Sequence, residues 1–239
     1  MSNCKEAVIL AGGKGTRLRP YTVVLPKPLM PIGDMPILEV IIRQLAKHGF
    51  SKVTLAVNHQ AEIIKAFFHD GEKWGIKIEY SNEDRPLGTM APLRNIQGLP
   101  ENFLVMNGDI LTNLDYSEFF DEHVLNKNIF TISSYSRKQS VDYGVLVPNE
   151  NRLLQDFIEK PTYFYEVSMG IYMMSRSALK FIPQTGEYGF DKLMLDLIAA
   201  QQPAAVRKFD GYWLDIGRPD DYAQAIDEFD KLRESFIGE

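Results

Sequence analysis

The sequence has little of what several classes of protein require. Its only cysteine is Cys4, so no internal disulfide can form. It contains no apolar run of about 18 residues and no signal-peptide pattern, so neither a transmembrane helix nor secretion is expected. Lysine and arginine form no basic stripe, and the formal net charge is −6, which argues against a nucleic-acid surface. We expect a cytoplasmic protein that binds neither membranes nor nucleic acids.

Histidine, cysteine and serine offer no recognisable catalytic arrangement. The histidines show no metal-ligand spacing with Cys4 or with one another, so we expect them at structural positions in the core or on the surface. No serine or cysteine stands beside a plausible base, so a covalent nucleophile is not predicted. The histidines are His48, His59, His69 and His123.

The sequence does contain a glycine-rich loop directly after a short apolar run. Residues 7–10 read Ala-Val-Ile-Leu and predict a buried strand. Gly12, Gly13 and Gly15 follow, and their lack of a side chain lets backbone N–H groups approach an anion closely. A glycine turn with solvated charges is the alternative interpretation. The clustering of glycines and basic residues after a strand favours a phosphate site.

Basic side chains accompany this loop. Arg17 and Arg19 offer planar forks of donors that suit phosphate oxygens, and Lys27 supplies a point charge. Pro26 and Pro28 restrict the backbone on both sides of Lys27, so its charge is presented in one direction. The segment lacks both the Gly-x-x-x-x-Gly-Lys-Ser/Thr pattern of a P-loop and the third glycine of a dinucleotide fingerprint. We therefore predict a triphosphate site of another kind.

Two aspartates are candidates for binding a hard cation. Asp109 lies one glycine beyond a predicted buried strand at residues 103–106, and Asp215 lies in the segment Trp-Leu-Asp-Ile-Gly-Arg-Pro at residues 213–219. Mg²⁺ is typically held by one or two carboxylates together with phosphate oxygens. Taken alone, each aspartate could equally occupy a turn or cap a helix.

The order of the expected elements predicts the fold class. Strands and helices alternate through the first half, which indicates a mostly parallel, doubly wound α/β sheet with ligands at the carboxyl ends of its strands. Strands dominate from residue 129 onward, and a hairpin is expected around residues 210–211. No repeat or linker divides the chain, so one domain covering residues 1–239 is expected. Helices are expected at about 36–48, 61–68, 88–97, 190–200 and 219–232, and strands at 53–57, 76–80, 103–106, 129–135, 143–147, 153–159 and 167–174.

The segment at residues 9–31 resembles the signature of the sugar-1-phosphate nucleotidyltransferases, the nucleotide-sugar pyrophosphorylase family. That signature reads Leu-Ala-Gly-Gly-x-Gly-Thr-Arg-Leu-x-Pro-Leu-Thr and then Pro-Lys-Pro-Leu-x-Pro, and this chain departs from it only at Tyr21. The segment around Asp215 is similar to the family's Trp-x-Asp-x-Gly-x-Pro-x-Asp-Tyr. The resemblance runs from Ala7 to about Phe229 and implies a Rossmann-like, GT-A-like mixed sheet, the nucleotide-diphospho-sugar transferase fold.

The resemblance implies an enzyme that converts an NTP and a sugar 1-phosphate into an NDP-sugar and pyrophosphate, with Mg²⁺ held by Asp109 and Asp215. Arg17, Lys27 and Asp109 would be catalytic. The nucleotide half would cover about residues 1–115 and the sugar-phosphate half about 116–239. The implied nucleotide-binding residues are Leu10, Gly12, Gly13, Gly15, Thr16, Arg17, Lys27, Glu83, Gly88 and Thr89. The implied sugar-phosphate-binding residues are Gly144, Glu159, Lys160 and Ser168.

Two segments bear on the identity of the substrates. Residues 86–93 read Pro-Leu-Gly-Thr-Met-Ala-Pro-Leu and resemble guanylyltransferases acting on mannose-type and manno-heptose phosphates, whereas the Leu-Ala-Gln of thymidylyl relatives is missing. Ser168 and Met169 stand where relatives usually have Asn and Ala, which predicts altered sugar recognition. We expect GTP and a mannose-type or heptose 1-phosphate, used by a monomer or homodimer. The open alternatives are uridylyl, thymidylyl or cytidylyl transfer, the last including phosphocholine as acceptor, an inactive regulatory subunit, and a Rossmann dehydrogenase.

Overall fold

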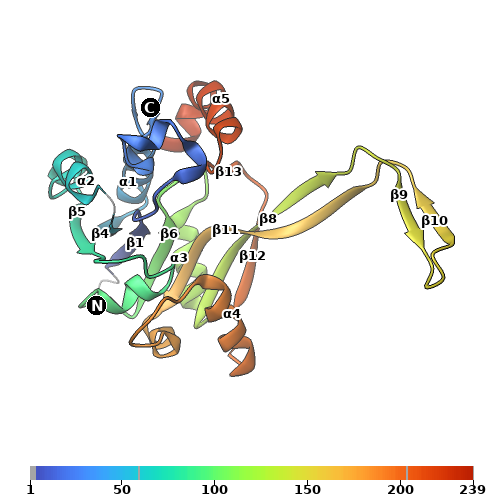
Figure 1. Cartoon of the computed structure of the whole chain (residues 1–239). Coiled ribbons are helices and arrows are strands. Elements are labelled where there is room, and N and C mark those ends of the chain that lie inside the picture. Colours follow the sequence, from blue (N-terminus) through green and yellow to red (C-terminus); the bar gives the residue numbers. More distant parts are fainter. Residues whose placement is uncertain (1–3, 59, 203, 239) are drawn as a thin grey trace.

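A seven-stranded mixed sheet forms the centre of the computed structural model, which describes residues 4–58, 60–202 and 204–238 (Figure 1). From one edge to the other, its strands are β12 (Ala205–Phe209), β8 (Phe130–Ser140), β11 (Thr162–Ser175), β6 (Asn102–Asn107), β1 (Lys5–Leu10), β4 (Phe50–Val57) and β5 (Lys77–Asn82). β1 runs parallel to β4 and β6, whereas β11 runs antiparallel to both of its neighbours. The sheet is therefore mixed, and the half formed by β6, β1, β4 and β5 is parallel, as predicted.

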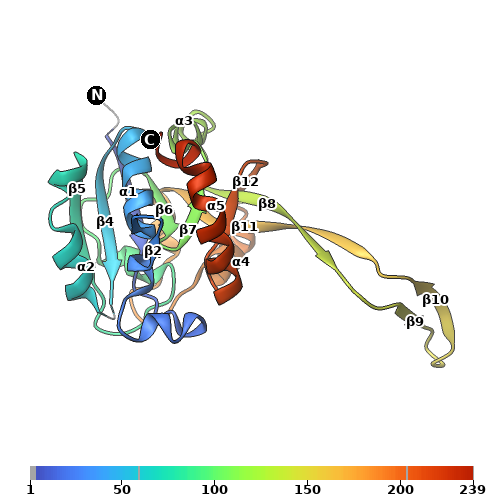
Figure 2. The same ribbon diagram turned by 90° about the horizontal axis from the view of Figure 1, so that it is seen from above.

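Helices cover both faces of the sheet. They are α1 (Ile37–Lys47), α2 (Ala61–Phe68), α3 (Tyr116–Leu125), α4 (Phe190–Ala199) and α5 (Pro219–Ile237). Successive side chains of a strand point to opposite faces. Ile9 of β1 accordingly packs in the core that α1 and α5 cover, whereas Val8 packs in the core that α4 covers. α1 and α5 lie side by side on their face (Figure 2). The doubly wound α/β arrangement is confirmed.

Helix α3 was not predicted, although its first turn carries a signal. The carboxylate of Asp115 accepts a hydrogen bond from the Glu118 N–H at 2.9 Å, which satisfies one of the free donors at the helix start. The apolar periodicity is obscured because His123 is fully buried on the inner face. A polar residue in the core therefore hid the amphipathic pattern.

The helix predicted at residues 88–97 is wrong. Only a short 3₁₀ turn forms there, at Ala91–Asn95. Gly88 adopts φ +83°, which is outside the helical region, and the N–H groups of residues 90 and 91 donate to the backbone oxygen of Tyr188 at 3.0 and 3.1 Å. Contacts with a distant segment therefore replace the helical hydrogen bonds.

The hairpin predicted around residues 210–211 is also wrong. β12 pairs in parallel with β8, whereas the next strand, β13 (Trp213–Asp215), pairs antiparallel with β7 (Ile110–Thr112). Both partners are distant in sequence, so no local turn signal could reveal them. The pairing of β13 with β7 has a functional consequence, because β7 directly follows Asp109.

β8 and β11 continue beyond the sheet as a two-stranded ribbon. The hairpin of β9 (Val145–Pro148) and β10 (Leu154–Ile158) extends this ribbon further. We refer to residues 136–167 as the arm. In both views the arm stands away from the rest of the chain, here termed the body (Figures 1 and 2).

A further small hairpin, β2 (Pro31–Ile32) with β3 (Met35–Pro36), leads into α1. No helix within the described ranges is long and apolar enough to cross a membrane. Of the histidines expected at structural positions, His59 lies outside the described residues.

Candidate active site

The glycine-rich loop and Asp109 start side by side at one edge of the sheet. Leu10 and Asn107, the last residues of β1 and β6, are paired, and the Gly108 N–H donates to the Leu10 carbonyl at 3.0 Å. This edge holds the carboxyl ends of the parallel strands, where α/β sheets bind their ligands. The alternation of strands and helices thus places the two predicted motifs together.

The glycine loop depends on the conformation of Gly15. Its φ is +59°, and a Cβ atom added there would lie 2.9 Å from Cγ2 of Thr22. The Thr22 hydroxyl in turn donates to the Gly15 carbonyl at 2.6 Å. The loop then forms a 3₁₀ turn at Thr16–Leu18, in which Leu18 is buried and Arg17 is exposed. Leu18 therefore anchors the turn while Arg17 stays accessible to a ligand.

Lys27 forms an ion pair with Asp109. Its ammonium group donates to Oδ2 of Asp109, and Lys27 is 8% exposed between two buried prolines. The other carboxylate oxygen, Oδ1, is buried and has no hydrogen-bond partner in the described part of the chain. A buried carboxylate oxygen without a partner is costly. A bound cation would compensate that oxygen.

Asp215 lies beside Asp109. The Ile216 N–H donates to the backbone oxygen of Asp109 at 3.0 Å, so the two segments run together. Burial raises the pKa of Asp215 and the negative charge of Asp109 raises it further, whereas the charges of Lys27 and Arg17 act in the opposite direction. Two carboxylates and two basic groups therefore share one electrostatic environment.

These two carboxylates fit a divalent cation. No group of three or more His, Cys, Asp or Glu side chains suited to a metal occurs among residues 4–58, 60–202 and 204–238. Mg²⁺, however, usually takes only one or two carboxylates and completes its shell with water and substrate phosphates. The orphaned Oδ1 of Asp109 and the nearby Asp215 match that donor set.

A hollow of about 320 Å³ opens at the ends of β1, β4 and β6. Gly12 forms part of its wall, and a Cβ atom there would lie 3.2 Å from Oε1 of Glu83 and 3.2 Å from Cβ of Asn58. Burial raises the pKa of Glu83, and the hydrogen bond that its carboxylate accepts from the Leu87 N–H partly offsets this rise. The predicted residues that line this hollow are Leu10, Gly12, Gly13, Glu83, Gly88, Thr89 and Asp109.

Two asparagines in this hollow were not predicted. Asn58 directly follows β4, and its Nδ2 is buried without a hydrogen-bond partner in the described chain. Asn107 is the last residue of β6. Both lie where parallel strands end, and this position in the sequence could have indicated that they belong to the site. The unsatisfied amide of Asn58 is a donor that a bound nucleotide can use.

A second hollow, of about 280 Å³, lies around Ser168 and Asp215 and shares Asn107 with the first. The rings of Tyr172 and Phe190 stack there with centroids 4.6 Å apart, and Trp213 Nε1 donates to the Met169 carbonyl at 3.0 Å. Ser168 thus lines the same hollow as Asp215. Arg137 was not predicted, because β8 runs past its expected end at residue 135.

The remaining predicted sugar residues, Gly144, Glu159 and Lys160, are not brought to this edge. They lie on the arm, where Gly144 packs against Glu159 and the Phe157 ring; a Cβ atom at Gly144 would be 2.5 Å from that ring and 3.2 Å from Oε2 of Glu159. Glu159 and Lys160 are exposed. The structure therefore divides the predicted site residues between the body and the arm (Figure 1).

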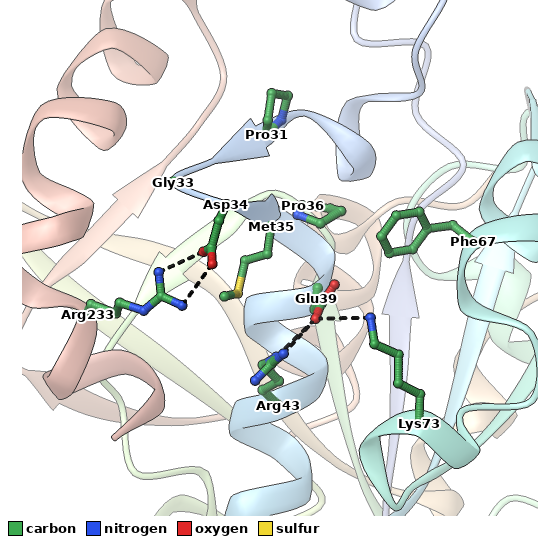
Figure 3. A pocket seen from close by; sticks show the side chains of 10 residues that line it. All are labelled: Pro31, Gly33, Asp34, Met35, Pro36, Glu39, Arg43, Phe67, Lys73 and Arg233. Carbon is green, nitrogen blue, oxygen red and sulfur yellow. Dashed lines mark hydrogen bonds and ion pairs between the residues drawn. The ribbon is translucent and has the colours of Figure 1, made fainter. Parts of the chain in front are cut away.

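A hollow of about 540 Å³ lies elsewhere, between α1, α2 and α5, and no predicted site residue lines it (Figure 3). Arg233 donates to Asp34 at 2.7 Å, and Glu39 accepts from Arg43 at 2.9 Å and faces Lys73 at 3.7 Å. Its charged side chains are thus paired with one another. They tie α5 to the turn before α1, and the segment after α2 to α1 itself.

Comparison with known proteins identifies the family. Residues 6–231 match the nucleotidyl transferase family, and the chain belongs to it. It is 34% identical to the UTP–glucose-1-phosphate uridylyltransferase of Synechocystis, with 92% of this chain and 62% of that protein covered. It is 31% identical to the mannose-1-phosphate guanylyltransferase of Mycobacterium tuberculosis, covering 92% of this chain and 63% of that protein. The chain therefore spans less than two thirds of the length of these relatives.

A solved structure matches over its full length. HddC from Yersinia pseudotuberculosis, complexed with GMP-PN, superposes with a TM-score of 0.71 at 26% identity, covering 94% of this chain and 99% of that one. The predicted family and fold class are confirmed. Enzymes of this family are generally divalent-metal dependent, which agrees with the paired aspartates described above.

Proposed function

We propose that this protein transfers a nucleotidyl group from an NTP to a sugar 1-phosphate, producing an NDP-sugar and pyrophosphate. One observation carries the proposal: the glycine-rich loop, the Lys27–Asp109 ion pair and Asp215 meet at a single sheet edge, between the hollow at Gly12 and the hollow at Ser168. Two substrates can therefore bind in neighbouring hollows beside one charged cluster.

The chemistry suits a site without a histidine base. A phosphate monoester is largely ionised at neutral pH, so an oxygen of the sugar phosphate can attack the α-phosphorus without losing a proton to the protein. The bond from the α-phosphorus to the bridging oxygen breaks, and pyrophosphate leaves. Such a transfer needs in-line positioning and neutralisation of repelling charges.

The side chains divide this work. Arg17, exposed beside the glycine loop, neutralises the leaving pyrophosphate with a planar fork of donors. Lys27 is held in place by its buried setting and orients the α-phosphate. Asp109 and Asp215 would hold Mg²⁺, which when bound would supply positive charge that offsets the repulsion of the two anionic substrates. Glu159 and Lys160 recognise the sugar and its phosphate.

GTP is the nucleotide that the hollow at Gly12 favours. An ionised carboxylate only accepts hydrogen bonds, and the Watson–Crick edge of guanine offers two adjacent donors, whereas uracil and thymine offer one donor between acceptors. Glu83 supplies such a carboxylate in the hollow. The Synechocystis relative is named a uridylyltransferase and the Mycobacterium tuberculosis relative a guanylyltransferase. The structure of HddC was solved in complex with GMP-PN.

The acceptor is a mannose-type or heptose 1-phosphate. At position 168 the second hollow contains a short hydroxyl where relatives usually have an amide, so the N-acetyl group of an aminosugar loses the amide partner at that position. A polar group left without a partner costs about 1–3 kcal/mol. We expect N-acetylglucosamine 1-phosphate to be a poor substrate for that reason.

Pyrophosphate release tests the proposal directly. The protein is incubated with each of GTP, UTP, dTTP, CTP and ATP against a panel of sugar 1-phosphates and phosphocholine, with and without Mg²⁺. We expect release only with Mg²⁺ and fastest with GTP and a mannose-type or heptose 1-phosphate. Activity with CTP and phosphocholine alone would reassign the enzyme, and no release with any pair would refute the proposed activity.

A variant tests the assignment of the base. Glu83→Gln replaces one acceptor oxygen by an NH₂ donor that faces the donors of guanine. We expect kcat/KM for GTP to fall at least ~10-fold, a loss of about 1.4 kcal/mol, with a smaller change for UTP. Glu101→Gln, an exposed position away from the hollow, is the control. Equal losses for GTP and UTP would show that Glu83 does not select the base.

A further inference from the structure

The arm exposes an unusual amount of apolar surface. Among the described residues, twenty large hydrophobic side chains are exposed, and ten of them belong to the arm. A two-stranded ribbon without a covered face is marginally stable in water, and contiguous exposed apolar surface marks an interaction site. The ten are Tyr143, Leu146, Val147, Leu153, Leu154, Phe157, Ile158, Tyr163, Phe164 and Tyr165.

The arm also carries site residues that its own body does not use. Glu159 and Lys160 are exposed, and the hollow around Ser168 lies at the base of the arm. The extended chain of β11 from Thr162 to Ser168 spans roughly 20 Å at about 3.3 Å per residue, and Lys160 lies two residues beyond Thr162. The body of each copy thus contains the nucleotide site but not Glu159 and Lys160. The arm carries these two residues far from the nucleotide site of its own body.

The arm is poorly suited to folding back onto its own body. β8 and β11 pair continuously from Ser134–Ser168 out to Ser140–Thr162, and their register slips only between Ser168 and Tyr172. Closure would require this ladder to break or to bend sharply at that irregularity. The arm can instead contact another molecule while all the backbone hydrogen bonds between β8 and β11 are kept.

Resting on the function proposed above, we propose that the arm of one copy covers the active site of a second copy, so that Glu159 and Lys160 act in trans. A two-fold arrangement completes both sites at once, because each copy gives one arm and receives one. The ten exposed apolar side chains then pack against the partner, and the active form is an arm-exchanged homodimer.

Light scattering tests the arrangement independently of catalysis. Replacing residues 141–161 by Asn-Gly joins the paired Ser140 and Thr162 through a tight hairpin turn. We expect a dimer for the wild type and a monomer for this shortened variant. Leu146→Ser combined with Leu154→Ser should also give a monomer, whereas the equally exposed Leu125→Ser on α3 should leave the dimer intact. A monomeric wild type, or a dimer that survives shortening, overturns the proposal.

Mixing two inactive variants tests catalysis in trans. Lys160→Ala damages the arm and Asp109→Asn damages the body, so a mixed dimer contains one site built from two intact parts. After co-refolding or co-expression we expect about 25% of wild-type activity, because half of the dimers are mixed and each has one good site. Activity no higher than that of the separate variants, with an active wild type, shows that the arm serves its own body and overturns the proposal.

The two experiments separate the inference from the function on which it rests. A wild type that releases no pyrophosphate with any substrate pair removes the proposed activity. Light scattering then decides whether the arm joins two copies, since a monomer refutes the exchange and an arm-dependent dimer supports it.

Discussion

Lys27 and Asp109 are 82 positions apart in the sequence and form an ion pair at the edge of the central sheet. This partly buried pair gives little net stability, because the desolvation of both charges offsets their attraction. An apolar pair of similar volume would serve the fold as well. The charges are therefore best explained by the phosphates and the cation that they are placed to bind.

Asp109→Asn should abolish most of the activity and keep the fold. The amide still accepts a hydrogen bond from Lys27, but it is a much weaker ligand for a cation than a carboxylate. We expect kcat to fall at least ~100-fold, with a far-ultraviolet circular dichroism spectrum like that of the wild type. Asp227→Asn, an exposed position on α5, is the control and should be unchanged. Near-normal turnover in Asp109→Asn would remove Asp109 from the metal site.

Lys27→Met keeps the volume of the side chain and removes its charge. The loss of a preorganised contact to the α-phosphate should cost about 2–4 kcal/mol of transition-state stabilisation, which is about 30- to 900-fold in kcat/KM. Lys192→Met, an exposed lysine on α4, should leave the kinetics unchanged. If Lys27→Met altered only the KM for the sugar phosphate, the assignment of Lys27 to the nucleotide would be wrong.

The parts of the site that the sequence predicts are those built from local motifs. The glycine loop, Lys27 and Asp109 each lie within a few residues of the end of a parallel strand, and this topology alone brings them together. The same rule also covered Asn58 and Asn107, but neither was named as a site residue.

The parts that the sequence did not predict depend on long-range pairing. Asp215 lies against Asp109 because β13 pairs with β7 and not with β12; the resemblance to the family implied this pair of aspartates, but no local pattern predicted the strand pairing. The helix expected from residue 88 gives way to contacts with Tyr188. The arm is the largest such feature, because nothing in the alternation of residues 143–159 shows whether these strands join the main sheet or leave it.

Gly12→Ala and Gly13→Ala form a matched pair that tests the nucleotide hollow. A Cβ atom at Gly12 would lie 3.2 Å from both Asn58 and Glu83, whereas one at Gly13 would meet nothing within 4 Å. Neither glycine has a positive φ that only glycine adopts readily. We expect Gly12→Ala to raise the KM for the NTP several-fold with little change in the melting temperature, and Gly13→Ala to have a smaller effect. Similar effects of both variants on KM would place the nucleotide elsewhere.

His123 should make the protein less stable in acid. The ring is fully buried, its Nδ1 lies 2.8 Å from the Thr131 hydroxyl, and burial lowers its pKa from 6.5 to about 4. Between pH 6.5 and 4 the unfolded chain binds a proton that the folded chain does not. The stabilising contribution is therefore complete above pH 6.5 and declines as the pH falls towards the folded-state pKa.

From these pKa values, His123 alone should lower the free energy of unfolding by about 2 kcal/mol between pH 8 and pH 5. Urea unfolding of the wild type and His123→Gln at both pH values measures this, and the variant should lose correspondingly less stability on acidification. His69→Gln, at an exposed histidine, should behave like the wild type. Nuclear magnetic resonance titration of the His123 ring in the wild type gives a second measurement that does not depend on the variant's folding. A ring that titrates near pH 6.5 in the folded protein would contradict the prediction, because the neutral form would then gain nothing from burial.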